Sequence, residues 1–302
     1  MKKPEKKVLL CDASFSVIPI LQALKKNGFH VTSCGNREDD PCHTLADSSL
    51  IANYADQNKI LDYVIANKYD YVVPGCTDIS FSTSSYIGKK LNMPGYDHGN
   101  ITEIFNNKKK FREYCVLNSF KTPRYTSKKS DLSSFKFPIL KKPIDSFSGR
   151  GINKIMSVAE LNLLDDTDTD IYEEFVTGQL FSHSAFIKNG EIIIDFFVEE
   201  HCTIYPYQVN TSCVTQNLNE GIKKNMRNWL ESYAKLAHLN DGLIHTQFIS
   251  DNLNYWLIET SRRCPGDLYS LLIKKSCDID YAELFAMPYC ELNYPVDSIN
   301  IS

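Results

Sequence analysis

The chain has 302 residues, of which 43% are hydrophobic and 23% are charged, a composition typical of soluble globular proteins. This length exceeds a single ordinary core and predicts two or three subdomains. A net charge of −4 argues against nucleic acid as the main ligand, because proteins that bind its backbone carry a basic surface. The sequence has no run of about eighteen apolar residues, so we expect no membrane span.

The ten cysteines show no paired spacing, which predicts free thiols in a reducing compartment. The apolar run at 8–10 is too short for a signal peptide, so we expect a cytoplasmic protein. The spacing of four histidines indicates neither a metal site nor a catalytic triad: His183, His201, His238 and His245. We expect three cysteines that could be nucleophiles to be inert thiols instead: Cys202, Cys213 and Cys264.

Strand and helix patterns alternate over residues 1–105. The expected strands are Val8–Cys11, Phe29–Cys34 and Tyr71–Val73, and the expected helices are Ser16–Asn27, Lys59–Asn67 and Ser84–Leu91. This βαβ order predicts a Rossmann-like parallel sheet. The first strand-to-helix turn lacks GxGxxG, so we expect no dinucleotide site there. Asp12, Ser14, Asp78 and Ser80 stand at strand ends, where helix capping and turn formation are the favoured interpretation.

Residues 106–302 begin with a basic-headed helix over 106–123 and continue with strand-rich sequence. The expected strands are Phe137–Lys141, Ile171–Val176, Phe181–Ile187, Glu191–Val198, Leu243–Ser250 and Tyr255–Thr260. Asn189-Gly190 predicts a hairpin turn. We expect a long loop over 199–219, a helix over Glu220–Leu239 and helical sequence up to about residue 290.

The stretch 137–152, FPILKKPIDSFSGRGI, combines a strand that ends in lysines with a loop of small residues. Small side chains let backbone N–H groups approach an anion closely and allow positive φ angles. A strand-borne lysine beside such a loop suits a polyphosphate. An ordinary surface turn is the alternative interpretation.

Four segments stand in a fixed order: NKKKFR, FPILKKPIDSFSGRGI, IYEEFVTGQLFS and HTQFISDNLNYWLIETSRRCPGD. Together they resemble the ATP-grasp superfamily, in the group that contains biotin carboxylase, carbamoyl-phosphate synthetase and the L-amino-acid ligases. The resemblance implies an α/β and α+β protein, in which a Rossmann-like domain (1–105) precedes a two-lobed ATP-grasp fold. The small lobe (106–175) would carry the lysines and a glycine-rich lid, and the C-terminal lobe (176–302) the metal site.

The resemblance also implies roles for individual residues, with ATP and Mg²⁺ as cofactors. The implied nucleotide-binding residues are Lys108, Lys142, the lid residues Ser148, Gly149, Arg150 and Gly151, and the hinge residues Glu173, Glu174, Phe175 and Val176. The implied metal ligands are Gln247, Glu259 and Ser261. Lys142, Glu259 and Arg263 would be catalytic, and Arg262 and Arg263 would face the substrate.

Three positions depart from the family pattern. Gln247 stands where an acidic residue is usual, Ser261 where asparagine is usual, and Leu180 where a ribose-binding glutamate is common. Gln247 and Ser261 offer oxygen ligands without charge, so Glu259 is left as the one anionic metal ligand.

The resemblance implies an ADP-forming carboxylate–amine ligase that acts through an acyl phosphate on a small carboxylic acid, such as an amino acid or a sugar acid. The alternatives are a nucleotide-binding regulator with a decayed metal site and a bicarbonate-dependent carboxylase. We expect small-molecule carboxylate and amine partners, and neither nucleic acid nor membrane. Similar proteins are often homodimers, but no self-complementary face is legible in the sequence.

Overall fold

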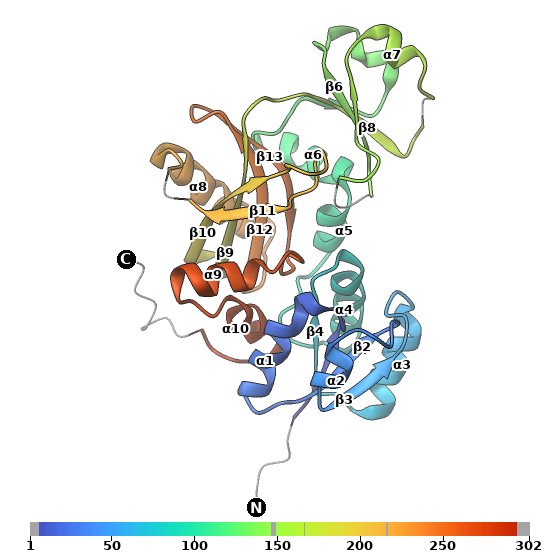
Figure 1. The fold of residues 1–302 in the computed structure, drawn as a ribbon, viewed down its shortest axis with the longest axis vertical. Helices are drawn as coiled ribbons and strands as arrows, with labels where there is room; N and C mark the ends of the chain where they lie inside the picture. Colours follow the sequence, from blue (N-terminus) through green and yellow to red (C-terminus); the bar gives the residue numbers. More distant parts are fainter. Residues whose placement is uncertain (1–5, 146–148, 166, 216, 295–302) are drawn as a thin grey trace, which may run out of the picture.

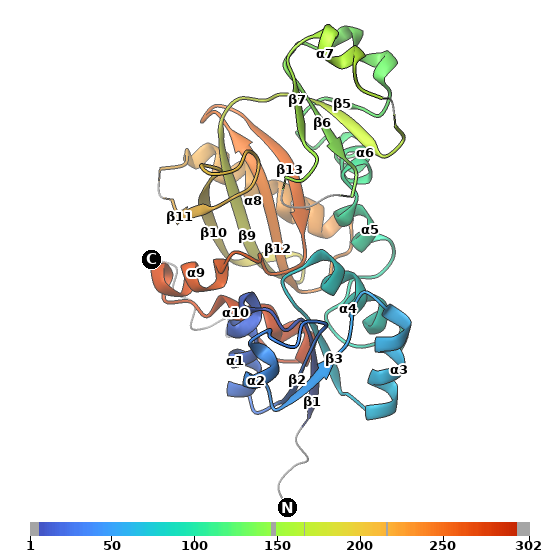
Figure 2. The same cartoon turned by 45° about the vertical axis from the view of Figure 1, so that its right-hand side comes forward.

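The computed structural model describes residues 6–145, 149–165, 167–215 and 217–294. These residues form three sheets, which follow one another along the longest axis of the molecule (Figure 1). The N-terminal sheet lies at one end, the small lobe at the other, and the largest sheet between them (Figure 2). The boundaries at 105/106 and 175/176 stay a prediction.

The N-terminal sheet is parallel, in the order β3-β2-β1-β4, which confirms the predicted Rossmann-like arrangement. Its elements are β1 (Lys7–Cys11), η1 (Phe15–Val17), α1 (Ile18–Lys26), β2 (His30–Gly35), α2 (Cys42–Leu45), β3 (Ser48–Ile51), α3 (Gln57–Asn67), β4 (Tyr71–Pro74) and α4 (Asp78–Leu91). The α1 helix packs on the face that carries Val8 and Leu10. The α3 and α4 helices pack on the opposite face, which carries Leu9 and Val72.

The structure of this domain differs from the sequence-based expectations at three places. The helix expected from Ser16 begins at Ile18, because a 3₁₀ turn comes first. The helix expected from Ser84 begins at Asp78, since the Thr77 side chain caps it by accepting a hydrogen bond from the Ser80 N–H at 3.0 Å. The edge strand β3 escaped prediction because two of its four residues are serines and three of the four are exposed.

The small lobe is an antiparallel sheet in the order β5-β8-β6-β7. Its elements, with the two helices that lead to it, are α5 (Ile101–Asn106), α6 (Lys108–Leu117), β5 (Tyr125–Thr126), η2 (Lys129–Ser134), β6 (Ile139–Pro143), β7 (Asn153–Ile155), α7 (Val158–Asn162) and β8 (Asp170–Glu174). The α6 helix is amphipathic as expected, with Phe111 and Cys115 buried and Tyr114 half-buried.

The largest sheet is antiparallel, in the order β11-β10-β9-β12-β13. Its elements and those that cover it are β9 (Gln179–Lys188), β10 (Glu191–His201), β11 (Thr211–Val214), α8 (Glu220–Leu236), β12 (Gly242–Ser250), β13 (Tyr255–Ser261), α9 (Tyr269–Cys277), α10 (Tyr281–Ala286) and η3 (Met287–Cys290). The α8 helix covers one face, and α9 and α10 cover the other. The same core cluster as α10 includes α1, which joins the N-terminal domain to this sheet.

Two predictions on this sheet have opposite outcomes. The Asn189-Gly190 turn is confirmed, with φ angles of 53° and 76° in the left-handed region that such a hairpin requires. The long loop expected over 199–219 is partly wrong. The β10 strand continues to His201, and 211–214 form the edge strand β11, whose Cys213 pairs with Glu199.

All ten cysteines fall within the described residues and none forms a disulfide, as expected. Among the described residues, no helix has both the length and the apolar character that crossing a membrane requires.

Candidate active site

A cavity of about 380 Å³ lies between α4, α6 and β13, and we call it the central cavity. Four residues implied by the family resemblance line it: Lys108, Glu259, Ser261 and Arg263. Six residues of the N-terminal domain also line this cavity: Ala55, Gln57, Asp78, Ile79, Ser82 and Thr83. The fold therefore brings the two implied cations, Lys108 and Arg263, to one site with Glu259, the implied metal-binding carboxylate.

Lys108 is the first residue of α6, and its N–H donates to the carbonyl oxygen of Ile144 at 2.8 Å. Burial lowers the pKa of the Lys108 ammonium, and the charge of Lys142 lowers it further, against the opposing effect of Glu259. An anion placed between these two ammonium groups would reduce the repulsion between them in this largely buried site. The electrostatics at this point fit a polyphosphate.

Lys142 lies on β6 and is 5% exposed. Its Nζ is 2.6 Å from Oε2 of Glu173 on β8, while Nε of Arg112 is 2.8 Å from Oε1 of the same carboxylate. Burial opposes ionisation of Glu173, but the two cations outweigh it and lower the pKa of Glu173 to about 2. The carboxylate thus stays charged and holds Lys142 in place.

Arg112 is fully buried on α6, one helical turn after Lys108. Besides Glu173, its guanidinium donates to the carbonyl oxygen of Ile258, the residue before Glu259. Arg112 therefore connects α6 directly to β13, which carries Glu259, and through Glu173 to Lys142 on β6. Sequence reasoning missed it, because an arginine within a basic helix resembles a solvated surface residue.

The implied metal ligands lie on the last two strands of the large sheet. Gln247 of β12 faces Glu259 of β13 across the ladder, and Ser261 follows Glu259 on the same face of the strand. Glu259 and Ser261 line the central cavity, whereas Gln247 does not. The Gln247 amide instead donates from Nε2 to Oε2 of Glu200 at 2.6 Å.

Glu200 is a second carboxylate near this site that sequence reasoning did not single out. It is the last residue but one of β10, two strands away from the strand that carries Gln247, and is 2% exposed. Burial raises its pKa to about 7, and the charges of Asp267 and Glu259 act in the same direction. A sequence shows neither the strand order nor the long reach of this side chain, so nothing in the spacing pointed to it.

Arg263 follows β13 and pairs with the carboxylate of Asp78 at the start of α4. Burial opposes its charge, but Asp78 and then Glu259 raise the pKa of the guanidinium above its ordinary value. Asp78, for which capping or turn formation is the favoured interpretation from the sequence, is also a counter-ion in the wall of the central cavity.

Arg262 lies apart from the central cavity, which corrects the expectation that it faces the substrate. Its side chain is 2% exposed and forms an ion pair with Asp97 at 2.9 Å. It also donates to the carbonyl oxygens of Leu243 and Asn240 at 2.9 and 2.6 Å. Arg262 and Arg263 form a bend after β13, in which Arg262 is buried in the interior and Arg263 lines the central cavity.

Among the described residues, those of the expected lid and hinge do not line the central cavity. Gly149 and Gly151 have φ angles of 69° and 75°, and Arg150 between them is exposed. Ser148, the remaining lid residue, lies outside the described residues. In the hinge, Glu174 is exposed, and Phe175 and Val176 are half-buried.

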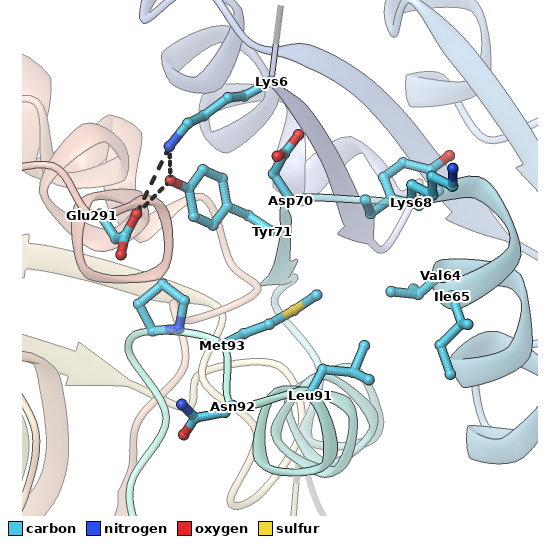
Figure 3. A pocket seen from close by; sticks show the side chains of 12 residues that line it. Lys6, Val64, Ile65, Lys68, Asp70, Tyr71, Leu91, Asn92, Met93 and Glu291 are labelled. Carbon is cyan, nitrogen blue, oxygen red and sulfur yellow. Dashed lines mark hydrogen bonds and ion pairs between the residues drawn. The ribbon is translucent and has the colours of Figure 1, made fainter.

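A second cavity, of about 480 Å³, opens at the opposite end of the strands of the N-terminal sheet (Figure 3). Lys6, Tyr71 and Glu291 meet there, with Tyr71 donating to Glu291 at 2.7 Å. Lys6 precedes β1 and Tyr71 begins β4, so this cavity lies at the amino ends of the parallel strands. Open α/β sheets bind ligands at the carboxyl ends, which favours the central cavity.

Comparisons with solved structures agree with this architecture. Phosphoribosylglycinamide synthetase from Anaerococcus prevotii superposes with a TM-score of 0.80 and 19% identity, over 96% of this chain and 76% of that one. L-amino acid ligase from Bacillus licheniformis gives 0.78 and 17%, over 96% and 75%. N5-carboxyaminoimidazole ribonucleotide synthetase from Thermotoga maritima gives 0.74 and 18%, over 95% and 76%.

These similarities confirm that the chain has the ATP-grasp fold. Among proteins of known sequence, it is similar to a formate-dependent phosphoribosylglycinamide formyltransferase from Prochlorococcus marinus (strain MIT 9312). The two are 24% identical over an alignment of 328 positions, which covers 98% of this chain and 78% of that protein. No protein-family profile matches the chain.

Proposed function

We propose that this protein is an ATP-dependent carboxylate–amine ligase that releases ADP and phosphate. The observation that carries the proposal is the convergence of Lys108, Glu259 and Arg263 on the central cavity, with Lys142 close enough to Lys108 to lower its pKa. Phosphoryl transfer depends on positioning and on charge neutralisation, and this cluster supplies both.

The nucleotide is assigned to the junction of the two ATP-grasp lobes. The ammonium groups of Lys108 and Lys142 neutralise its phosphates, and Gly149–Gly151 of the predicted lid cover them with backbone N–H groups. Residues 173–176 hold the adenine edge through backbone groups. Two similar structures, both of N5-carboxyaminoimidazole synthetases in complex with ADP, support this assignment.

Glu259 and Ser261, with Gln247, are the residues that would hold Mg²⁺. They offer the hard oxygen donors that Mg²⁺ prefers, and one carboxylate suffices when nucleotide and water complete the octahedron. When bound, the ion supplies charge neutralisation at the phosphates. Arg263 adds a fixed positive charge next to them, and Asp78 keeps its guanidinium aimed into the cavity.

The proposed reaction has two steps. An oxygen of the acid attacks the γ-phosphorus of ATP, the bond from that phosphorus to the β–γ bridging oxygen breaks, and ADP leaves. The amine then attacks the carbonyl carbon of the acyl phosphate, the carbon–oxygen bond to phosphate breaks, and the nitrogen loses a proton. Arg263 stabilises the charge on the transferred phosphoryl group in both steps.

A small acid is the substrate class that we propose. The central cavity, at about 380 Å³, is at the small end of ligand sites. The similar proteins include a formate-dependent formyltransferase and an L-amino acid ligase. An amino acid or a sugar acid remains our choice for the acid, and the ten unpaired thiols support the cytoplasm as the location.

The test is an ADP-release assay with ATP, Mg²⁺ and a matrix of small acids and amines. We expect release only when an acid and an amine are both present, and loss of release in Glu259→Gln. Glu191→Gln, an exposed glutamate at the start of β10, is the matched control. Release that persists in Glu259→Gln would falsify the proposed mechanism, and release that needs bicarbonate but no amine would indicate a carboxylase.

A second candidate is a nucleotide-binding regulator without turnover. The contact between Gln247 and Glu200 favours it, because the amide is engaged away from the central cavity. Calorimetry distinguishes the two: ADP binding with no phosphate release under any substrate mixture supports the regulator, and phosphate release excludes it.

A further inference from the structure

Three side chains with three different donor atoms meet at the outer edge of the large sheet. Glu199 and His201 come from β10, and Cys213 comes from the edge strand β11. One ligand atom from each lies within 4.8 Å of the other two. Glu199 and His201 share the face that carries Phe197 and α8, so they lie on the opposite side of the sheet from Glu200. We propose that these three residues form a binding site for a divalent transition-metal ion of the zinc class.

The strand register explains why the site forms. Glu199 pairs directly with Cys213 across the antiparallel ladder, and His201 lies two residues after Glu199, so all three side chains emerge on one face. Nε2 of His201 is already 3.2 Å from Oε1 of Glu199. Ligand atoms around tetrahedral zinc lie about 3.3–3.8 Å apart, so the thiol needs a movement of only about 1 Å.

The donor set selects the class of ion. A thiolate and an imidazole suit zinc and its neighbours, whereas Mg²⁺ and Ca²⁺ prefer oxygen ligands alone. The side chains of Glu199 and His201 are 28% and 34% exposed, and Cys213 is exposed, so an ion can enter from solvent. Water would take the fourth position, and binding would release the thiol proton of Cys213.

The site closes the base of a loop that reaches the predicted lid. Residues 202–210 connect β10 to β11, and the Asn210 N–H donates to the carbonyl oxygen of His201 at 3.0 Å. At the loop, Tyr207 lies against Gly149, where an added methyl group would approach the Tyr207 carbonyl oxygen to 2.6 Å. An ion that joins the two strands would restrict this loop and the glycine-rich segment that it contacts. The consequence for the lid rests on the proposed function, but the metal site itself does not.

The binding experiment uses the full-length, tag-free protein, reduced and freed of metal with a chelator. We expect one equivalent of Zn²⁺ to remain after gel filtration, and Co²⁺ to give a thiolate-to-cobalt absorption band. Cys213→Ser should abolish the band, and His201→Asn should weaken Zn²⁺ binding by more than about tenfold. Cys202→Ser, which alters the half-buried neighbouring thiol, should bind like the wild type.

Two outcomes would overturn the metal site: no stoichiometric binding at micromolar Zn²⁺, or binding that Cys213→Ser leaves unchanged. Circular dichroism of each variant verifies that the fold is intact. Hydrogen exchange with and without Zn²⁺ tests the loop, where we expect slower exchange over 202–210. Unchanged exchange in the zinc-loaded protein would refute the link to the loop. None of these measurements depends on ligase activity.

Discussion

The guanidinium of Arg112 donates a hydrogen bond to the carbonyl oxygen of Ile258, 146 residues further along the chain, at 2.7 Å. The same group binds Glu173, whose other oxygen holds Lys142. Arg112 thereby fixes the position of Lys142 on β6 relative to the residue that precedes Glu259 on β13. It is a positioning residue, since its own side chain is fully buried.

Arg112→Met is therefore expected to destabilise the protein and to weaken nucleotide binding. Removing one partner of a buried ion pair costs about 3–5 kcal/mol, and Lys142 alone would remain to compensate Glu173. Urea unfolding measures the stability, and calorimetry with ADP measures the affinity. Glu113→Gln, on the exposed side of the same helix, is the control. Unaltered stability in Arg112→Met would contradict the linking role.

The lowered pKa of Glu173 predicts that the folded protein loses stability in acid. Its pKa is about 2 in the folded protein against 4.5 for the unperturbed group, so the unfolded chain binds more protons between these values. The stabilisation from this carboxylate is fully present above about pH 4.5 and is lost as the pH falls towards 2. The loss is on the order of 3 kcal/mol.

Unfolding free energies measured at intervals from pH 6 to pH 2 check this prediction. Glu173→Gln should be less stable at pH 6, because Arg112 and Lys142 lose their counter-charge. Its stability should also fall less steeply with acid than that of the wild type. Parallel curves for the two proteins would mean that Glu173 is not the group that titrates.

The sequence predicted most of the fold because hydrophobic periodicity and turn residues act locally. Helix and strand positions such as Val8–Cys11 and the turn at Asn189-Gly190 depend on neighbours along the chain, and the structure has them. Strand β11 was missed, since its four residues, Thr211–Val214, have one half-buried apolar side chain and owe their conformation to pairing with β10.

The candidate site was predictable only where a motif fixed the residue. Lys108, Glu259 and Arg263 stood in recognisable segments, and all three line the central cavity. Glu200 was not predictable, because its contact with Gln247 depends on the strand order of the sheet. The cluster of Glu199, His201 and Cys213 likewise depends on the β10–β11 register, whereas the sequence shows only a distant histidine and cysteine.

Arg262 should behave as a structural residue. Arg262→Ala leaves Asp97 buried without a cation, which we expect to cost about 3–5 kcal/mol in the free energy of unfolding. Below its melting temperature, the variant should bind ADP with the affinity of the wild type, because Arg262 lies outside the central cavity. Arg37→Lys, at a surface arginine, provides the control for stability. A large loss of ADP affinity in the folded variant would restore the ligand role.

Lys141 and Lys142 form a matched pair for testing the nucleotide site. They are adjacent on β6, but Lys142 contacts Glu173 at 2.6 Å, whereas Lys141 contacts Asp170 at 3.2 Å, on the other face of the strand. Lys142→Met removes one of the two ammonium groups assigned to the phosphates, so we expect ADP affinity to fall by about tenfold or more. Lys141→Met removes the same charge from the same strand and should leave affinity within about twofold, because the Lys141 ammonium is paired with Asp170 on the face of β6 opposite to Lys142.

The comparison separates position from net charge. Calorimetry at two salt concentrations measures both variants, and the defect of Lys142→Met should persist at high salt because its surroundings are buried. Equal losses in the two variants would show that β6 contributes only a general positive potential. In that case Lys142 would have no specific contact with the phosphates, and the assignment of the nucleotide to the junction of the lobes would fail.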